Sequence, residues 1–272
     1  MASRKSSKKP KNMAAHNKKV ASRIKPASKL PKRYRALIYG RSGAQKTRVA
    51  STAPDVLVID VNEQGTDSVR KDYDPNVFPV VYWNDLNDIF WYLESGDHPY
   101  KSVSVDGVTA MQTLCMKFVL GDEAARDASR DPDMPSRPIW GKVNELMKTQ
   151  ITNYRNLPMN VIFTALQRKQ VSGDEDDGDD EEIFYSPACT PGIAGHLEAA
   201  VGMIGYLHTS QVYAPRKEAE KGKKSKKKRE RISRTRLIIG PSDRYLTKDR
   251  YGLMVPHIDS PNITRILKQI YG

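Results

Sequence analysis

One short segment constrains the fold of this chain more than any other. An apolar run at 34–39 is followed by a turn and a lysine–threonine pair, in the order Gly40, Arg41, Ser42, Gly43, Ala44, Gln45, Lys46 and Thr47. A helical pattern then continues to Ala53 and stops at Pro54. In a strand–turn–helix of this kind, backbone N–H groups at the start of the helix attract anions. The segment therefore predicts a phosphate-binding loop that follows a buried strand.

The loop departs at one position from the usual pattern, in which a glycine precedes the lysine. That position is Gln45 here. Glycine normally lets the backbone approach phosphate closely, and a glutamine in a helical conformation would preserve binding in a reshaped loop. We expect Lys46 to bridge the β- and γ-phosphates of a nucleotide and the Thr47 hydroxyl to bind Mg²⁺. The alternative is an ordinary strand–turn–helix with an incidental Lys-Thr pair.

From residue 34 onward, short apolar runs alternate with helical patterns. The expected strands are 56–60, 77–82, 102–106 and 159–166, and the expected helices are about 85–94, 108–120 and 140–154, with a proline-containing loop over 121–138. Strands near 201–213 and 234–239 and a helix near 262–270 would extend the sheet. The alternation predicts an α/β fold with a mostly parallel sheet flanked by helices.

Polar side chains follow the predicted strands at the edge where parallel sheets bind ligands. Asp106 ends a strand 60 residues after Lys46 and is expected to hold the Mg²⁺ hydration shell beside Thr47. Glu63 follows the second strand and either polarises the attacking water or is a solvated loop acid. Gln167 follows the strand at 161–166 and either senses the γ-phosphate or is a polar strand end.

Two further candidate site residues, both of them cations, lie near the end of the chain. Lys248 and Arg250 alternate around Asp249, so they share a side of an extended segment. They are candidate cationic fingers that reach phosphates, including those of a neighbouring subunit. A surface charge cluster is the alternative.

Charge is distributed in blocks. The formal net charge is +13, from 45 Lys plus Arg and 32 Asp plus Glu. Residues 1–33 contain 12 basic residues and no acid, residues 216–236 have a net charge of +9, and residues 173–182 contribute −8. Such polar segments bury too little apolar area to offset chain entropy. We predict a disordered basic tail at 1–33 and a domain at 34–272 with an acidic insertion at 173–182 and a basic insertion at 216–232.

The two kinds of charged segment have different expected roles. The basic segments are typical of contact with nucleic-acid phosphates, which releases counterions. Solubilising tails or a nuclear-import-like signal are the alternatives. The acidic segment is expected to be a solvated insertion. The alternative is that it acts as a decoy, which competes with DNA for the basic segments.

Other chemistries and compartments receive little support from the sequence. Cys115 and Cys189 are far apart, which argues against a disulfide framework or a cysteine zinc site and fits a reducing compartment. The five histidines show no metal-binding spacing. No apolar run approaches the length of a membrane span, and the N-terminus lacks the apolar part of a secretory signal. We expect a cytoplasmic protein with no membrane partner, whose tryptophans lie in the core or at an interface.

The ordered blocks resemble the phage-encoded RecA-like ATPases, a family of phage nucleotide-binding or AAA-type proteins that includes RecA-type single-strand annealing recombinases. The resemblance runs from about Tyr34 to Tyr271. It rests on RALIYGRSGAQKT, VLVIDVNEQGT, HPYKSVSVDGVTAMQ, WGKVNELM, LPMNVIFTAL, SPACTPGIAGHLEAAVGMIGYL and PSDRYLTKDR. It implies a RecA-like P-loop NTPase core, ATP with Mg²⁺, a homo-oligomeric ring or filament, and single-stranded DNA as partner. A single-stranded-DNA-binding protein stays open as a further partner.

The resemblance also implies where DNA and neighbouring subunits lie. In such proteins the segment after the γ-phosphate-sensing strand faces DNA, but here that position holds the acidic segment. The basic segment at 216–236 is therefore the DNA candidate, with Lys223, Lys224, Lys226, Lys227, Lys228 and Arg229 as contacts. ATP would sit at the subunit border, where Lys248 and Arg250 of the next subunit couple nucleotide state to assembly.

The function expected from these features is an ATP-binding recombination protein. It would bind single-stranded DNA and promote annealing or strand exchange, with ATP hydrolysis. Two alternatives stay open. One is a nucleotide-gated accessory protein, such as a helicase loader or a packaging or replication factor, that acts mainly through a protein partner. The other is a nucleotide or small-molecule kinase, against which the basic segments and the lack of a clear acceptor-binding lid argue.

Overall fold

The computed structural model describes residues 12–61, 65–126, 134–172, 182–215 and 229–272. The chain divides into two units, Met1–Lys32 and Arg33–Gly272. In the first unit, helix α1 (Met13–Ala21) starts after Asn12, whose Oδ1 accepts the Ala15 N–H at 3.1 Å. A short 3₁₀ turn, η1 (Ala27–Lys29), follows. Every described residue of this unit is exposed.

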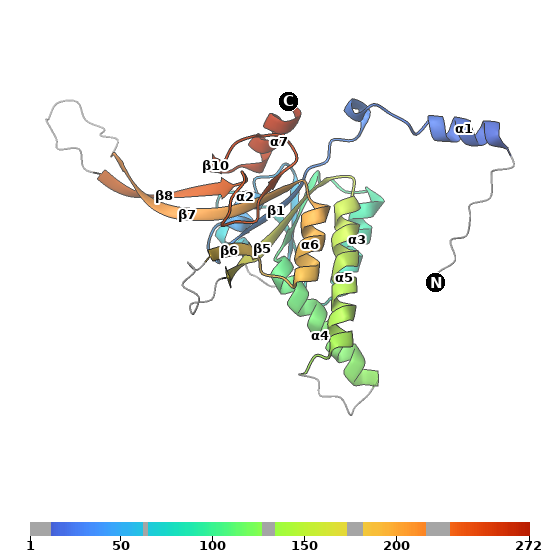
Figure 1. Cartoon of the computed structure of the whole chain (residues 1–272), viewed down its shortest axis with the longest axis horizontal. Helices are drawn as coiled ribbons and strands as arrows, with labels where there is room; N and C mark the ends of the chain where they lie inside the picture. Colours follow the sequence, from blue (N-terminus) through green and yellow to red (C-terminus); the bar gives the residue numbers. More distant parts are fainter. Residues whose placement is uncertain (1–11, 62–64, 127–133, 173–181, 216–228) are drawn as a thin grey trace. The chain divides into compact units, whose positions relative to one another are not determined.

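The second unit is built on a ten-stranded sheet (Figure 1). Its strands are β1 (Arg35–Gly40), β2 (Val56–Asp60), β3 (Asn76–Pro79), β4 (Ser102–Asp106), β5 (Asn160–Ser172), β6 (Glu182–Pro187), β7 (Met203–Pro215), β8 (Arg229–Ile238), β9 (Lys248–Asp249) and β10 (His257–Asp259). Its helices are α2 (Lys46–Ala50), η2 (Gly65–Ser68), α3 (Asp85–Ser95), α4 (Val108–Arg126), α5 (Arg137–Asn156), α6 (Pro191–Ala200) and α7 (Ile263–Tyr271).

The strand order brings the ends of distant segments to one edge of the sheet. The order is β10-β8-β7-β1-β5-β4-β2-β3, and the run from β7 to β3 is parallel. β5 stands between the loop-bearing strand β1 and β4. Gly40 pairs with Leu166, and Asp60 pairs with Asp106. The phosphate loop, Asp60 and Asp106 therefore lie at the same carboxyl edge.

The sheet is covered on both faces, and alternation along β1 shows this directly. Leu37 and Tyr39 belong to one apolar cluster together with the buried faces of α3, α4, α5 and α6. Ala36 and Ile38 belong to a second cluster with α2 and α7. Successive side chains of a strand point to opposite faces of the sheet. A central parallel strand that is covered on both faces is therefore apolar on both sides, as β1 is. The predicted α/β fold, with a mostly parallel sheet flanked by helices, is confirmed.

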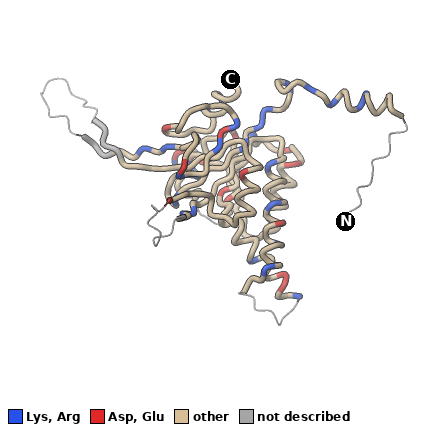
Figure 2. The backbone as a smooth tube through the Cα atoms, in the orientation of Figure 1, with Lys and Arg blue, Asp and Glu red and all other residues tan. Residues whose placement is uncertain are grey.

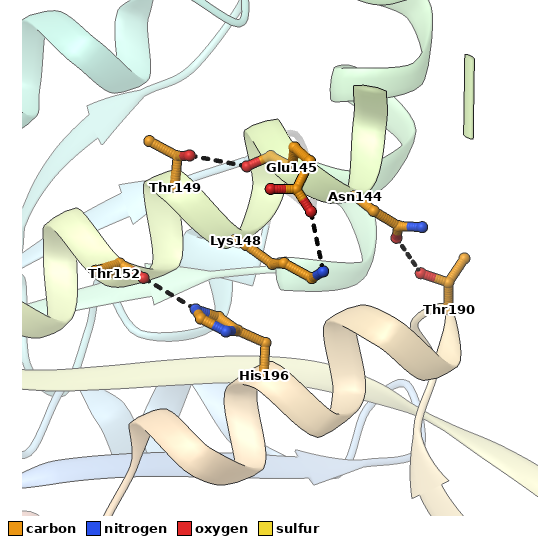
Figure 3. Close-up of polar contacts among 7 residues, drawn as sticks. All are labelled: Asn144, Glu145, Lys148, Thr149, Thr152, Thr190 and His196. Atoms are coloured by element: carbon orange, nitrogen blue, oxygen red, sulfur yellow. Dashed lines mark hydrogen bonds and ion pairs between the residues drawn. The ribbon is translucent and has the colours of Figure 1, made fainter. Parts of the chain in front are cut away.

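Polar contacts join the two helices that are adjacent on one face (Figure 3). The Thr190 hydroxyl, just before α6, donates to Asn144 Oδ1 of α5 at 2.9 Å. About two turns further along α5, Thr152 Oγ1 and His196 Nε2 of α6 are 2.9 Å apart. These side-chain pairs fix the register of α6 on α5 outside the apolar contact.

Several expected boundaries differ from the structure. β5 does not end at Leu166 but continues to Ser172, because its second half pairs antiparallel with β6. β6 and α6 have no counterpart among the expected elements. α4 extends to Arg126 and α5 begins at Arg137, inside the expected loop. β8 begins at Arg229, so the last residues of the expected insertion at 216–232 belong to a strand. Residues 173–181 and 216–228 lie outside the described residues.

β7 and β8 form a long hairpin, which we call the arm. Their pairing runs from Tyr206 with Ile238 to Pro215 with Arg229. The far half of the arm projects beyond the sheet (Figure 1). Arg234 and Arg236 lie on β8, and Figure 2 shows basic residues in blue along the arm. In the sequence, the two ends of the arm flank residues 216–228, the first part of the basic segment at 216–236.

A buried arginine connects the start of the sheet to the end of α5. The Arg35 guanidinium donates to the carbonyl oxygens of Arg155 and Leu157, each at 2.6 Å, and to that of Met159. These carbonyls lie at the C-terminus of α5 and just beyond it, where they have no partner within the helix. Burial lowers the pKa of Arg35 to about 10, so the side chain stays charged at neutral pH.

We predict that Arg35→Met lowers the free energy of unfolding by about 3 kcal/mol, because several buried carbonyl groups lose their donor. Urea denaturation measures the change. The matched control is Arg33→Met, whose side chain is exposed, and a change within about 0.5 kcal/mol is expected there. Equal losses in the two variants would contradict the capping role of Arg35.

Candidate nucleotide-binding site

The phosphate loop contains two residues in the left-handed region of backbone space. Gly43 has φ = +74° and Gln45 has φ = +70°. Gln45 immediately precedes α2 and acts as its N-cap. The expectation that Gln45 adopts an ordinary helical conformation is therefore wrong. The loop keeps the backbone path that glycine usually supplies, at a cost of about 1–2 kcal/mol for a residue with a Cβ.

The base of the arm supports this strained loop. The Thr235 hydroxyl of β8 donates to Gln45 Oε1 at 3.3 Å, and the Thr209 hydroxyl of β7 donates to the Ala44 carbonyl oxygen at 3.4 Å. A Cβ on Gly40 would lie 2.4 Å from the Leu207 carbonyl oxygen, so the loop backbone packs directly on β7. Gln45, which replaces the usual glycine, thus gains a side-chain contact with the arm that glycine could not make.

Lys46 is the buried cation of the loop. Only 6% of the residue is exposed. Its ammonium donates to the Arg41 carbonyl oxygen at 3.0 Å and to the Gly40 carbonyl oxygen at 3.4 Å. The ammonium is therefore held within the turn, at the positive end of α2, where both the cation and the backbone N–H groups favour an anion.

Thr47 and Asp106, which the sequence places 59 positions apart, are in direct contact. The Thr47 hydroxyl donates to Asp106 Oδ2 at 2.6 Å, and the Thr164 hydroxyl of β5 donates to Asp106 Oδ1. Burial raises the pKa of Asp106, and these two hydrogen bonds oppose the rise. The charge of nearby Asp60 raises the pKa further. The carboxylate is thus a desolvated base that a cation would stabilise.

The segment after β2 approaches this pair closely. A Cβ on Gly65 would lie 2.6 Å from Thr47 Oγ1 and 3.3 Å from Asp106 Oδ2. The Thr66 hydroxyl donates to Asp60 Oδ2 at 3.2 Å. The donor set here consists of hydroxyl and carboxylate oxygens, the ligands that Mg²⁺ prefers. Thr47 and Asp106 therefore fit a Mg²⁺ ion beside the loop, with Asp60 next to them.

Other predicted site residues are spread over the molecule. Gln167 follows the parallel part of β5, and its Oε1 accepts the Tyr206 hydroxyl at 2.9 Å. Lys248 pairs in β9 with Ile204, near the amino end of β7, so it lies at the opposite end of the sheet from Gly40. Its ammonium donates to the Glu198 carbonyl oxygen. Lys248 and Arg250 therefore do not meet the phosphate loop of their own chain.

Six of the predicted site residues lie outside the described part of the chain. Glu63 lies outside the described residues, as do Lys223, Lys224, Lys226, Lys227 and Lys228, while Arg229 is the first residue of β8. Three contact residues of the site have no counterpart in the sequence prediction: Gly65, Thr66 and Thr164. Glycine after a strand and threonine within a strand are common in sequences. These three residues are therefore recognised as part of the site only by their positions next to Asp106 and Asp60.

A polar pocket of about 460 Å³ begins at the loop and runs along α2. It is lined by Gln45, Arg48, Tyr73, Thr235, Asn262 and Arg265, among others. The Arg48 guanidinium lies 5.6 Å from the centre of the Tyr73 ring and forms an ion pair with Asp72 at 2.8 Å. The pocket thus combines cationic, amide and aromatic groups next to the phosphate-binding turn.

A buried lysine, a threonine–carboxylate pair and a left-handed turn between a parallel strand and a helix define a P-loop nucleotide-binding protein. The chain belongs to a family of AAA domains, whose model matches residues 32–251. A domain of this class binds a nucleotide, normally with Mg²⁺.

The flagellar accessory protein FlaH from Methanocaldococcus jannaschii is similar at 7% identity over 82% of this chain and 83% of that one, with a TM-score of 0.33. A likeness this distant supports no conclusion about function. A search of curated proteins finds no match. Within the described ranges, no helix is both long enough and apolar enough to cross a membrane.

We predict that Gln45→Gly is more stable than Gln45→Ala by about 1 kcal/mol. Glycine adopts the left-handed conformation without a steric penalty, whereas alanine keeps the penalty. Both variants lose the hydrogen bond with Thr235. The difference between their free energies of unfolding therefore reports the cost of the left-handed backbone conformation at position 45. Urea denaturation of the two purified variants measures it. Equal stabilities would show that position 45 is not left-handed in solution.

Proposed function

We propose that this protein is a Mg²⁺-dependent ATPase that binds single-stranded DNA and promotes annealing or strand exchange. The observation that carries the nucleotide part is the contact of Thr47 with buried Asp106, beside the ammonium of Lys46. A role in phage recombination is supported by the sequence resemblance alone.

The chain's own groups divide the nucleotide chemistry among them. Backbone N–H groups of the loop and the Lys46 ammonium bind the phosphates, and Lys46 exchanges its loop carbonyl partners for phosphate oxygens. Thr47 and Asp106 would hold Mg²⁺, which when bound supplies positive charge next to the phosphates. Glu63 is the residue that we propose to polarise the attacking water. Gln167, whose side chain is oriented by Tyr206, is the proposed sensor of the γ-phosphate.

The pocket along α2 is the proposed site of the nucleoside. Its volume of about 460 Å³ lies within the range of small-ligand sites. Tyr73 offers an aromatic side chain, and Asn262 offers an amide that can both donate and accept hydrogen bonds. Because Gln45 and Thr235 also line this pocket, a nucleoside there would be next to both the loop and the arm.

The DNA part of the proposal is supported by charge and position. Residues 216–236 have a net charge of +9; in the sequence they connect the end of β7 to β8 and include most of β8. A projecting hairpin with this charge suits the phosphates of a single strand. The base of the arm contacts the loop through Thr209 and Thr235, which would let DNA and nucleotide influence each other. In this proposal Lys248 and Arg250 act on the nucleotide of a neighbouring subunit in a ring or filament.

Lys46→Ala is expected to weaken ATP binding by at least ~100-fold, because the loop loses its buried phosphate-binding cation. Isothermal titration calorimetry with ATP and Mg²⁺ measures this, and circular dichroism checks the fold. Lys71→Ala, at an exposed position, is the matched control and should bind normally. An unchanged ATP affinity in Lys46→Ala would remove the phosphate-loop assignment.

Replacing Lys226, Lys227 and Lys228 with alanine is expected to flatten the salt dependence of single-stranded DNA binding. Each lost phosphate contact reduces the slope of log K against log salt by about 0.7, so three contacts amount to about 2. Fluorescence anisotropy at several salt concentrations measures the slope. The control replaces the exposed lysines Lys71, Lys117 and Lys268. A slope that is the same in both triple variants would place DNA elsewhere and favour the accessory-protein alternative.

A further inference from the structure

Thr164 is a fully buried polar residue of the central strand β5, and its hydroxyl makes two hydrogen bonds to the end of β4. The hydroxyl oxygen accepts the N–H group of Gly107 at 3.0 Å, and the hydroxyl proton is donated to Asp106 Oδ1. A threonine hydroxyl has a single proton, and a backbone N–H can only donate. The bond with Gly107 therefore leaves that proton for the carboxylate.

The two carboxylate oxygens of Asp106 have different surroundings. Oδ1 is held by Thr164, a residue of the neighbouring strand in the sheet. Oδ2 accepts the Thr47 hydroxyl at 2.6 Å, and a Cβ on Gly65 would lie 3.3 Å from it. Thr47 belongs to the helix that follows the phosphate loop, and Gly65 belongs to the segment after β2. Oδ2 is therefore the oxygen that faces the phosphate loop, and Oδ1 is the oxygen that is anchored to the sheet.

The two threonines that contact Asp106 differ in what they can do when a cation binds. Thr47 would bind Mg²⁺ through its hydroxyl oxygen, so its hydrogen bond with Oδ2 is open to change. Thr164 is buried within the sheet, and its hydroxyl is also bonded to the Gly107 N–H. The bond from Thr164 to Oδ1 is therefore the contact that can hold the plane of the carboxylate both with and without a cation.

We propose that Thr164 is a positioning residue of the metal site, whose hydroxyl holds Asp106 Oδ1 and thereby directs Oδ2 toward Mg²⁺. This inference rests on the proposed nucleotide function and adds a residue to that site. Groups that orient a metal-binding side chain typically contribute about 10–100-fold to metal affinity. Because Thr164 acts through Asp106 alone, it sets the effect of Mg²⁺ and leaves the binding of phosphates by the loop and Lys46 unchanged.

The test measures ATP affinity by isothermal titration calorimetry twice, once with Mg²⁺ and once with EDTA. It compares the full-length wild type with Thr164→Val, which keeps the shape of threonine without the hydroxyl, and with Thr164→Ser, which keeps the hydroxyl. Ser104→Ala is the matched control. Ser104 is buried in β4 on the same side as Asp106, and within the described part of the chain its hydroxyl has no hydrogen-bond partner.

We expect Mg²⁺ to tighten ATP binding by the same factor in the wild type, in Thr164→Ser and in Ser104→Ala. In Thr164→Val we expect this factor to fall by about 10-fold or more, because Asp106 loses the group that orients it. The affinity for ATP in EDTA should stay at the wild-type value in all variants, because the phosphate loop and Lys46 are unchanged.

A wild-type effect of Mg²⁺ in Thr164→Val would overturn the proposal. Equal losses of affinity with Mg²⁺ and with EDTA would also overturn it, because they would make Thr164 a purely structural residue. Circular dichroism checks the fold, and if Thr164→Val does not fold, Thr164→Cys, whose thiol is a weak donor, serves in the same comparison. A wild type that does not bind ATP, or whose ATP affinity does not depend on Mg²⁺, would contradict the proposed function itself and this inference with it.

Discussion

A buried carboxylate held by two threonine hydroxyls is the interaction on which the site depends. Asp106 accepts hydrogen bonds from Thr47, at the start of α2, and from Thr164, in the neighbouring strand β5. These bonds join the loop helix to two central strands. They also keep an oxygen-rich position beside the Lys46 ammonium, at the edge where the parallel strands end. Desolvation raises the pKa of the carboxyl, so a bound cation would remove an electrostatic cost that the fold otherwise bears.

The loop is supported from its other side by the arm. The contact of Gly40 with the Leu207 backbone is steric, and the contacts of Ala44 and Gln45 with Thr209 and Thr235 are hydrogen bonds. A left-handed glutamine is tolerated where its surroundings define its conformation. The same contacts put the most strained part of the loop against the hairpin whose ends flank the basic segment. In the proposed function, nucleotide and DNA would therefore act on one connected structure, formed by β1, the phosphate loop and the arm.

The sequence predicts those parts of the structure that depend on local patterns. Apolar runs and the strand–turn–helix at the loop identify the α/β core, and Asp106 is found because it ends a strand. Parts that depend on distant contacts are not predicted. Thr164 and Gly65 matter only because the strand order brings them to Asp106. Gln45 looks compatible with an ordinary helical conformation until Gly43 and the arm constrain it. The position of Lys248 at the amino end of β7, away from the phosphate loop of its own chain, depends on antiparallel pairing with that strand.

The central claim, that one connected structure binds ATP and single-stranded DNA, is tested most directly by steady-state ATP hydrolysis. The full-length protein is assayed with Mg²⁺, with and without single-stranded DNA, at low and moderate salt. The account predicts hydrolysis that DNA stimulates, with a stimulation that fades as salt weakens the phosphate contacts. Hydrolysis, or ATP binding, that DNA leaves unchanged at both salt concentrations would contradict it and would point to a nucleotide-gated protein whose partner is another protein.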